Sequence, residues 1–450
     1  MSTHVTIIGG GSYQWAPELM ADLFATPALA GMHLVLQDID PAPLPKMEAL
    51  AHKVSDALGA KATITSTTDR RAALEGAEFV IVCISTGGFA SMAVDLEVPA
   101  AHGITQTVGD SVGPGGINRA LRNVPVLVEI AKDVEAVCPD AWLFNITNPM
   151  TTLTRAVCRE TSVKTVGLCH EVGNFTMDLA IALGKPWDAI VPSVTGVNHF
   201  PVLTSLEVEG EDGFDIIRDL VQEVGGLDSL APEPGRPEPE PFSKLHFAQR
   251  HVLKLTMLDR WGTFPAAGDR HIAEFVAFAL TPESEWGAAY NISLSPISLR
   301  EKHQAEYVAD VDAWLAGTKD LQTWQSGELP APMISAMVTG EPMVAPVNIP
   351  NVGQAPGLPA DAVLESICVI DGEGIRGRDV SILPEPFNEI VRRHVATQEL
   401  TVEAALTGDR TLAGEAFALD PLAGRGDLRE TDAMVDELLA GTARWLPQFA

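Results

Sequence analysis

Short apolar runs alternate with helical spacings of apolar residues over the first third of the chain. Residues 5–8 form a β-branched run, and residues 78–84, 141–144 and 164–168 form three further, largely apolar runs. Continuous runs of this kind are typical of parallel strands that helices cover on both faces. Because strand and helix signals alternate, the pattern predicts an α/β fold with a doubly wound parallel sheet.

The alternation is lost after about residue 195. Helical spacing dominates residues 246–315 and 385–445, with shorter strand-like pieces elsewhere. A length of 450 residues allows two to three domains at about 150 residues each. We therefore predict an N-terminal domain of residues 1–195 that contains the sheet, and a C-terminal α+β domain of residues 196–450.

Two segments of the predicted second domain follow neither pattern. Residues 228–243 are rich in proline and glutamate and have almost no large apolar side chains. Burial of such a segment cannot offset the entropy lost on ordering it, so we expect an exposed loop. Residues 344–359 are rich in proline, glycine and asparagine, and we expect them to be irregular.

Charge and cysteine content narrow the class of protein. The chain has 30 Lys and Arg against 60 Asp and Glu, a formal net charge of −30, which repels the phosphate backbone of nucleic acids. No apolar run approaches the roughly 18 residues that a membrane helix needs. The five cysteines include no CxxC pair, which favours a reducing compartment. We expect a cytoplasmic protein with neither a nucleic-acid nor a membrane partner.

A glycine-rich loop, Gly9-Gly10-Gly11-Ser12, lies between the first predicted strand and a helix, and Asp38 ends the next strand. Glycines let the backbone approach a pyrophosphate at a helix N-terminus, and an acid roughly 20–30 residues later can bind ribose hydroxyls. Gln14 stands where the usual fingerprint has its third glycine. The pattern predicts an NAD site at Gly9, Gly11, Ser12 and Asp38, and the alternative is a tight turn without a ligand.

Polar residues follow two more predicted strands, at the edge where open α/β sheets bind ligands. The amide of Asn148, in Asn145–Pro149, can bind a cofactor or substrate hydroxyl. Cys169 begins the tetrapeptide Cys169-His170-Glu171-Val172, and His199 follows later in the chain. A thiolate and an imidazole can share a divalent transition metal. The alternatives are a polar turn, a buried apolar cysteine and an ordinary hydrogen-bonded histidine.

Asp269 and Arg270 precede an apolar segment with helical spacing. Asp269 is suited to cap the N-terminus of that helix, and it can act as a general base if a substrate lies nearby. From the local pattern alone, the cap is the favoured interpretation.

In order and spacing these motifs together resemble those of the NAD-dependent glycosidases of glycoside hydrolase family 4. Residues 107–116, 348–353, 403–409 and 419–422 are also similar, so the resemblance spans nearly the whole chain. It implies a Rossmann-like N-terminal domain and a C-terminal α+β domain, as in lactate and malate dehydrogenases. Members of the family form dimers and tetramers, which implies a homodimer or homotetramer.

The resemblance also implies roles for the site residues. Cys169 and His199 match the ligands of a divalent metal, usually Mn²⁺, and Asp269 matches the base. His170 matches the position of the group that assists departure of the leaving group. Asn148 matches an amide that contacts the substrate, and we also assign Arg270 to substrate binding.

The implied reaction is glycoside hydrolysis through oxidation of the sugar by NAD⁺. Hydride passes from sugar C3 to NAD⁺, and the metal stabilises the enolate that forms when a base removes the C2 proton. The aglycone then leaves C1, water adds in its place, and the hydride is transferred back to C3. The Cys-His-Glu-Val tetrapeptide is similar to that of members acting on unphosphorylated α-glucosides. No arginine follows Gly87-Gly88 to pair with a phosphate, so we expect little preference for glycoside 6-phosphates.

Two other classes of protein use the same scaffold. A 2-hydroxy-acid dehydrogenase would bind the substrate carboxylate through an arginine, but it leaves the Cys169 motif and the long C-terminal region unexplained. A non-catalytic NAD-binding sensor would tolerate loss of Cys169, His199 and Asp269. Net NADH production would identify the dehydrogenase, because a glycosidase recycles its NAD⁺.

Overall fold

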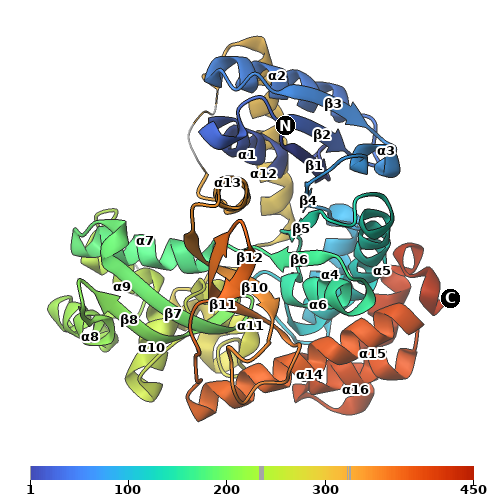
Figure 1. Ribbon diagram of the computed structural model, residues 1–450. Helices are drawn as coiled ribbons and strands as arrows, with labels where there is room; N and C mark the ends of the chain where they lie inside the picture. Colours follow the sequence, from blue (N-terminus) through green and yellow to red (C-terminus); the bar gives the residue numbers. More distant parts are fainter. Residues whose placement is uncertain (1, 233–237, 322, 324–325) are drawn as a thin grey trace.

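One mixed sheet runs through the protein (Figure 1). The computed structural model describes residues 2–232, 238–321, 323 and 326–450; part of the predicted 228–243 loop lies outside these ranges. Over the described residues the sheet has twelve strands, in the order β3-β2-β1-β4-β5-β6-β10-β11-β7-β8-β9, with β12 beside β11. The two short strands are β9 (Glu211–Asp212) and β12 (Gly374–Gly377).

The first six strands are all parallel and confirm the predicted fold class. From the outer edge inward they are β3 (Thr63–Thr67), β2 (His33–Gln37), β1 (His4–Ile8), β4 (Phe79–Val82), β5 (Trp142–Asn145) and β6 (Lys164–Gly167). Side chains of β4 alternate between two hydrophobic cores, because successive residues of a strand face opposite sides. Phe79 and Ile81 belong to one core, and Val80 and Val82 belong to the other.

Helices on the two faces complete these cores. The helices that contribute to the first core include α1 (Trp15–Ala25), α2 (Leu44–Leu58) and α13 (Pro330–Thr339), and those that contribute to the second include α5 (Gly113–Val137) and α6 (Met150–Glu160). Both faces of the inner parallel strands are therefore covered, which explains why their sequences are largely apolar, whereas the edge strand β3 is partly exposed and reads Thr-Ile-Thr-Ser-Thr.

The sheet continues past β6 with antiparallel strands. β10 (Met343–Pro350) pairs with β6 and β11 (Val363–Asp371), and β11 pairs with β7 (Ile190–Val197). β7 forms a hairpin with β8 (Phe200–Val208). The predicted domain boundary at residue 195 falls inside β7, and the sheet is unbroken across it.

The expectation that residues 344–359 are irregular is wrong for β10. Two prolines, Pro346 and Pro350, weakened the strand signal there. β6 pairs with β10 only at Asn348, so most of β10 has a single partner strand, and proline is tolerated in strands of that kind.

The predicted helical regions of the second half are confirmed in part. Residues 246–315 contain α9 (Lys244–Arg250), α10 (Val252–Trp261), α11 (Asp269–Phe275) and α12 (Ile297–Ala316), and residues 276–296 between them are not α-helical. The helices of the C-terminal region are α14 (Glu385–Thr407), α15 (Arg410–Leu419) and α16 (Leu428–Gly441). Among the described residues, no helix is both long enough and apolar enough to cross a membrane.

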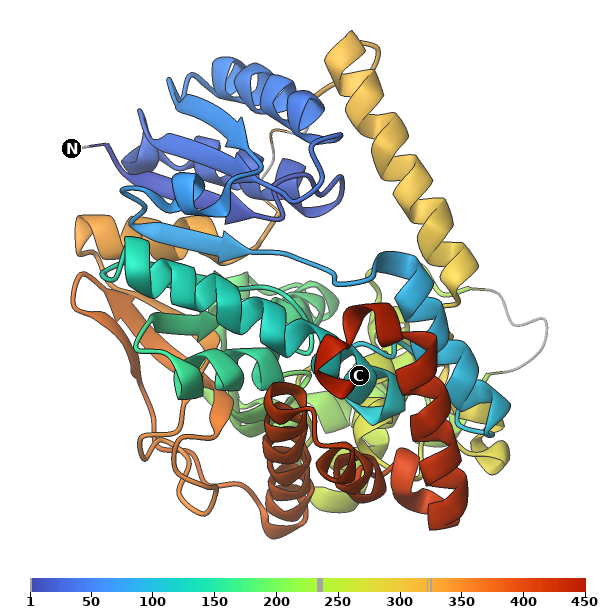
Figure 2. The same cartoon turned by 90° about the vertical axis from the view of Figure 1, so that its right-hand side faces the viewer.

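Helix α12 is the long diagonal yellow helix of Figure 2, and its residues Val311 and Trp314 are buried in the first core. At its C-terminal end, Lys53 of α2 donates to the carbonyl oxygens of Trp314 and Leu315, at 2.7 and 3.1 Å. At its other end, Arg300 donates to the carbonyl oxygen of Val108 at 2.8 Å. The helix thus connects the sheet domain to the loop before α5.

Candidate active site

The glycine-rich loop joins β1 to α1 at the carboxyl end of the parallel strands. Gly9 has a φ of +91°, and a Cβ atom there would lie 2.1 Å from the carbonyl oxygen of Cys83, so only glycine fits. The amide of Gly11 donates to Asp38 Oδ2 at 3.0 Å. The structure therefore brings together the predicted loop and the predicted acid.

Ser12 lies at the N-terminus of α1, in the same loop. Its Oγ accepts a hydrogen bond from the amide of Trp15 at 3.1 Å, which satisfies one of the free amides of the first helical turn. The free amides of this turn and the helix dipole favour an anion at this point.

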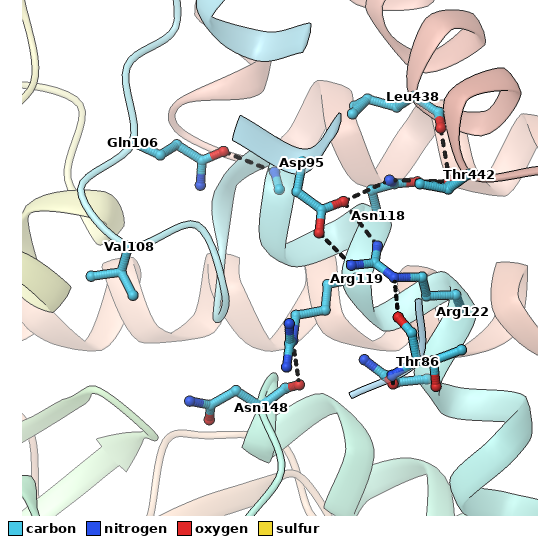
Figure 3. A network of polar contacts seen from close by, with 12 residues as sticks. Thr86, Asp95, Gln106, Val108, Asn118, Arg119, Arg122, Asn148, Leu438 and Thr442 are labelled. Carbon is cyan, nitrogen blue, oxygen red and sulfur yellow. Dashed lines mark hydrogen bonds and ion pairs between the residues drawn. The ribbon is translucent and has the colours of Figure 1, made fainter. Parts of the chain in front are cut away.

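A buried ion pair between Arg122 of α5 and Asp95 of α4 (Gly88–Ala101) supports this edge of the sheet (Figure 3). Both side chains have 0% exposure. Arg122 also donates from Nε to the carbonyl oxygen of Thr86, at 2.9 Å, and Asn118 connects Asp95 to Thr442. Thr86 follows β4, so the pair attaches the end of that strand to the helices.

Arg119, one helical turn before Arg122, reaches the predicted substrate-binding turn (Figure 3). Its Nε donates to the carbonyl oxygen of Asn148 at 2.9 Å. The Oδ1 atom of Asn148 is buried and has no hydrogen-bond partner among the described residues. The side-chain amide of Asn148 therefore has capacity for a ligand.

Cys169 lies directly after β6 and is buried, with 6% of its surface exposed. Burial raises the pKa of its thiol well above the usual value, and the nearby carboxylates of Glu365 and Glu171 raise it further. A free thiol here stays protonated, so a cation would have to displace the proton in order to bind sulfur.

His170 sits between two carboxylates. Its Nδ1 lies 2.6 Å from Glu328 Oε1, and its Nε2 lies 3.6 Å from Glu171 Oε1. The hydrogen bond to Glu328 raises the pKa of His170 to about 9, although burial opposes it. The imidazole therefore carries a proton at neutral pH and can donate it.

Asp110, His199 and His271 converge from three separate parts of the chain. Asp110 lies in the loop before α5, His199 in the turn between β7 and β8, and His271 in the first turn of α11. One potential ligand atom of each residue lies within 4.8 Å of those of the other two. Two imidazoles and a carboxylate suit a divalent transition metal. The predicted ligand His199 belongs to this cation cluster, whereas Cys169 is not one of its three members.

Ser111 determines which nitrogen of His199 is free. Its Oγ donates to Asp110 Oδ1 at 2.7 Å and lies 2.7 Å from His199 Nδ1. Because the hydroxyl has one proton, His199 must donate from Nδ1 to Ser111, which leaves the lone pair on Nε2.

The ionisation states in the cluster are those of metal ligands. Burial and the neighbouring His271 lower the pKa of His199 to about 3, so its imidazole is neutral. Burial raises the pKa of Asp110, but His271, His199 and Arg119 outweigh it and bring the value to about 2. A neutral imidazole and an ionised carboxylate are the forms that bind a cation.

Glu274 holds the loop that carries Asp110. The side chain is buried, and its Oε1 accepts from the amides of Val108 and Gly109 at 2.7 and 2.9 Å and from Thr107 Oγ1 at 3.1 Å. Burial raises the pKa of Glu274 to about 7. Glu274 belongs to α11, like His271, so one helix positions two parts of the cluster.

Asp269, the predicted base, begins α11 and faces Lys254 of α10. Its Oδ2 accepts from the amide of Leu253 at 2.7 Å, and its Oδ1 lies 3.4 Å from Lys254 Nζ. The carboxylate thus caps α10, a neighbouring helix, whereas the local pattern favoured a cap on its own helix. Arg270 is exposed, and its carbonyl oxygen accepts a hydrogen bond from Thr107 Oγ1.

Sequence reasoning did not assign Asp110, Ser111, His271 or Glu274 to the site. Asp110 and Ser111 lie within the segment 107–116, and His271 is two positions after Asp269, so each stood inside a motif already singled out. A histidine and a glutamate three positions apart on one helix face were the available signal for His271 and Glu274.

The fold and this site together define an α/β enzyme with two features: a glycine-rich loop of the dinucleotide-binding type and a separate cluster of potential cation ligands. Residues 4–185 match the family 4 glycosyl hydrolase model, and residues 194–423 match the model of the C-terminal domain of that family. The chain therefore belongs to family 4 of the glycosyl hydrolases.

Curated relatives extend this likeness over the full length. The chain is 34% identical to an α-galactosidase of Bacillus subtilis (strain 168) over 448 residues, which cover 99% of both chains. It is 32% identical to an α-galacturonidase of the same organism over 427 residues, 93% of both chains.

Solved structures agree with the fold. A putative glucosidase, lplD, from Bacillus subtilis has a TM-score of 0.87 and 30% identity, covering 97% of this chain and 100% of the other. A 6-phospho-α-glucosidase from gut microorganisms, solved in complex with NAD and Mn²⁺, has a TM-score of 0.82 and 19% identity, with 100% of both chains covered.

Proposed function

We propose that this protein hydrolyses α-glycosides of unphosphorylated sugars with the help of bound NAD⁺ and a divalent cation, Mn²⁺ being the first to test. The observation that carries the proposal is that a family 4 chain combines a glycine-rich loop of the dinucleotide-binding type with a partly buried cluster of potential cation ligands. The α-galactosidase relative makes an α-galactoside the first substrate to test, and the Cys-His-Glu-Val tetrapeptide makes an α-glucoside the second.

The residues present fit both groups. Gly9 and Gly11 let the loop lie close to Cys83, Pro43 and Asp38, which a Cβ atom would prevent. The free amides at the N-terminus of α1 would then bind a pyrophosphate, and Asp38 would bind ribose hydroxyls. Cys169 and His199 are the proposed metal ligands, and the complex of the 6-phospho-α-glucosidase with NAD and Mn²⁺ supports the choice of both groups. When bound, NAD⁺ would accept hydride from sugar C3 and the cation would polarise the resulting carbonyl.

The chain's own residues would handle the protons. His170, with Nδ1 held by Glu328, would donate the proton on Nε2 to the glycosidic oxygen. Asp269 is our candidate for removing the C2 proton, through the Oδ1 atom that faces Lys254. Its Oδ2 already caps α10, so a test of Asp269 must separate a base from an anchor.

The charges around the site favour a neutral sugar. Asp110 and Glu171 both have a pKa of about 2, since nearby histidines outweigh the effect of burial, and both stay ionised. No arginine follows Gly87-Gly88 at the start of α4 to pair with a sugar phosphate. Arg270 and Asn148 are the proposed contacts to sugar hydroxyls.

A panel of 4-nitrophenyl glycosides tests the proposal. The α-galactoside, α-glucoside, α-galacturonide and α-glucoside 6-phosphate are each assayed with NAD⁺, Mn²⁺ and a thiol reductant, and each addition is then omitted in turn. We expect one of the neutral glycosides to react at least roughly tenfold faster than the α-glucoside 6-phosphate, because the protein offers no arginine after Gly87-Gly88 to pair with the phosphate group.

Deuterium at C2 or C3 of the sugar should slow turnover, because both C–H bonds break in the proposed reaction. Hydrolysis without an isotope effect and without a need for NAD⁺ would contradict the mechanism. Net reduction of NAD⁺ by a 2-hydroxy acid would identify a dehydrogenase instead.

A further inference from the structure

We propose that Asp110 and His271 are further ligands of the divalent cation beside His199, so that the ligands which the protein supplies include two imidazoles and a carboxylate in addition to the proposed Cys169. The inference rests on the proposed function only in taking a divalent cation to be the resident group. The identity of the two added ligands comes from the geometry of the cation cluster.

The distances in the cluster suit one ion. Protein ligands about 2.1 Å from a small divalent cation are at most roughly 4.2 Å from one another. The ligand atoms of Asp110, His199 and His271 already lie within 4.8 Å of one another, so they need to close by less than about 1 Å. The two imidazole rings lie next to each other, with their centroids 3.9 Å apart and their planes tilted by 37°.

The hydrogen bonds of the cluster leave ligand atoms available. Ser111 takes up His199 Nδ1 and Asp110 Oδ1, so His199 Nε2 and Asp110 Oδ2 remain for a cation. His271 Nδ1 is buried and has no hydrogen-bond partner among the described residues. An unsatisfied buried polar atom costs about 1–3 kcal/mol, and coordination of the ring to a cation would relieve that cost.

A second carboxylate is attached to the start of α11, because Glu171 Oε2 accepts from the amide of Gly268, just before that helix. Carboxylates in a partly buried site are costly unless positive charge lies close to them, and a divalent cation bound at Asp110 would supply that charge.

Helix α11 fixes the two added ligands relative to each other. His271 lies on its first turn, and Glu274, one turn later, accepts three hydrogen bonds from Thr107, Val108 and Gly109, the residues that precede Asp110. Glu274 is therefore a positioning residue for the cation. Loss of such an outer partner typically lowers metal affinity about 10–100-fold.

The test is Mn²⁺ binding by the full-length, metal-free protein without NAD⁺ or sugar. Electron paramagnetic resonance titration gives the affinity, and electron spin echo spectroscopy counts the imidazole nitrogens bound to Mn²⁺. We expect two imidazoles in the wild type and one in His271→Gln, with affinity lowered about 10–100-fold. Asp110→Asn should weaken binding and keep both imidazoles.

Two further variants separate coordination from general damage. Glu274→Gln keeps every ligand, so it should keep two imidazoles with weaker binding. His52→Gln removes an exposed histidine of α2 and should leave both measurements unchanged. Circular dichroism confirms that each variant is folded.

A single bound imidazole in the wild type overturns this proposal without the need for any variant, and so does unchanged affinity in His271→Gln. The proposed function fails in a different way: the wild type would bind Mn²⁺ through two imidazoles and yet hydrolyse none of the glycosides. Hydrolysis by a wild type with one bound imidazole would keep the function and reject the added ligands.

Discussion

The glycine-rich loop and the cation cluster lie in one molecule, but they are built in different ways. The contact between Gly11 and Asp38 joins residues 27 positions apart, across two neighbouring parallel strands. The contact between Ser111 and His199 spans 88 positions, and that between Val108 and Glu274 spans 166. The loop depends on local backbone geometry, whereas the cluster depends on how α11 and the β7–β8 hairpin pack. Substitutions should therefore be able to damage one region and spare the other.

The largest effect should come from a substitution that damages both regions. Arg122→Ala leaves Asp95 buried without its partner, and we expect a loss of about 3–5 kcal/mol in the free energy of unfolding. Urea denaturation measures this loss. NADH and Mn²⁺ binding should weaken together, because α5 joins the Thr86 segment to the loop of Asp110.

The exposed pair of Arg429 and Asp427 provides the control, since Arg429→Ala should leave stability unchanged. Replacing both Arg122 and Asp95 by apolar residues of similar volume should recover part of the loss. A single variant, Arg122→Ala, as stable as the wild type would show that the pair does not support the site.

Two glycine substitutions should separate the regions. A Cβ at Gly9 would lie 2.1 Å from the Cys83 carbonyl oxygen, and one at Gly196 would lie 2.2 Å from the Phe200 carbonyl oxygen, in the hairpin that holds His199. We expect Gly9→Ala to lose about 100-fold in NADH affinity and to keep Mn²⁺ binding, and Gly196→Ala to do the reverse, since overpacking costs up to about 3 kcal/mol.

Fluorescence titration with NADH and paramagnetic resonance titration with Mn²⁺ are run on both glycine variants. If either variant lost both ligands to the same extent, the two regions would not be independent.

A smaller effect is expected on the rate of glycoside cleavage, with the glycine-rich loop and the cation cluster unchanged. Glu328→Gln removes the carboxylate that keeps His170 protonated, so proton donation to the leaving group should fail. Alkyl α-glycosides, which need that proton, should react about 10–100-fold more slowly. 4-Nitrophenyl glycosides, whose leaving group needs little help, should be affected least, and equal losses on both would argue against an acid role.

The smallest effect concerns acid stability outside both regions. Burial, together with Lys254, lowers the pKa of His251 to about 3 from 6.5, although Asp178 opposes this and Arg250 reinforces it. Between these pH values the unfolded state binds more protons, so stability falls as pH drops below 6.5. His251→Phe should lose about 1 kcal/mol less than the wild type between pH 7.5 and 5.5, measured by urea denaturation. Equal losses would show that another group controls acid unfolding.

The parallel half of the fold could be predicted because its signals are local. Most of its strands are apolar runs, and Gly9 and Asp38 stand at the ends of adjacent strands. The edge strand β3 was not predicted, because its sequence Thr-Ile-Thr-Ser-Thr has a single large apolar residue. β10 could not be predicted, since its prolines weaken the strand signal and its extended form depends on pairing with β11. The long helices α12 and α14 could be predicted from the spacing of their apolar residues. The conformation of the residues before α12 depends on contacts with distant parts of the chain, which the spacing of residues does not reveal.

The candidate site divides in the same way. Its members that directly follow strands, such as Asn148 and Cys169, were singled out by position, and the roles given to them stay predictions. His199 was predicted as a ligand, but its neighbours Asp110 and His271 are far away in sequence and no spacing relates them. Asp269 illustrates the converse, because its pattern indicated a helix cap and the structure uses the carboxylate to cap a different helix.

Because the sheet is continuous, the two halves of the protein should depend on each other for folding and for stability. The two segments matched by the family models, residues 4–185 and 194–423, meet within one sheet, where β6 pairs with β10 at Asn348. Neither segment alone would be a complete domain. Each would expose an edge strand whose unpaired backbone groups can pair with other chains. When the two segments are produced separately, each should aggregate. In the intact chain both should unfold in a single thermal transition.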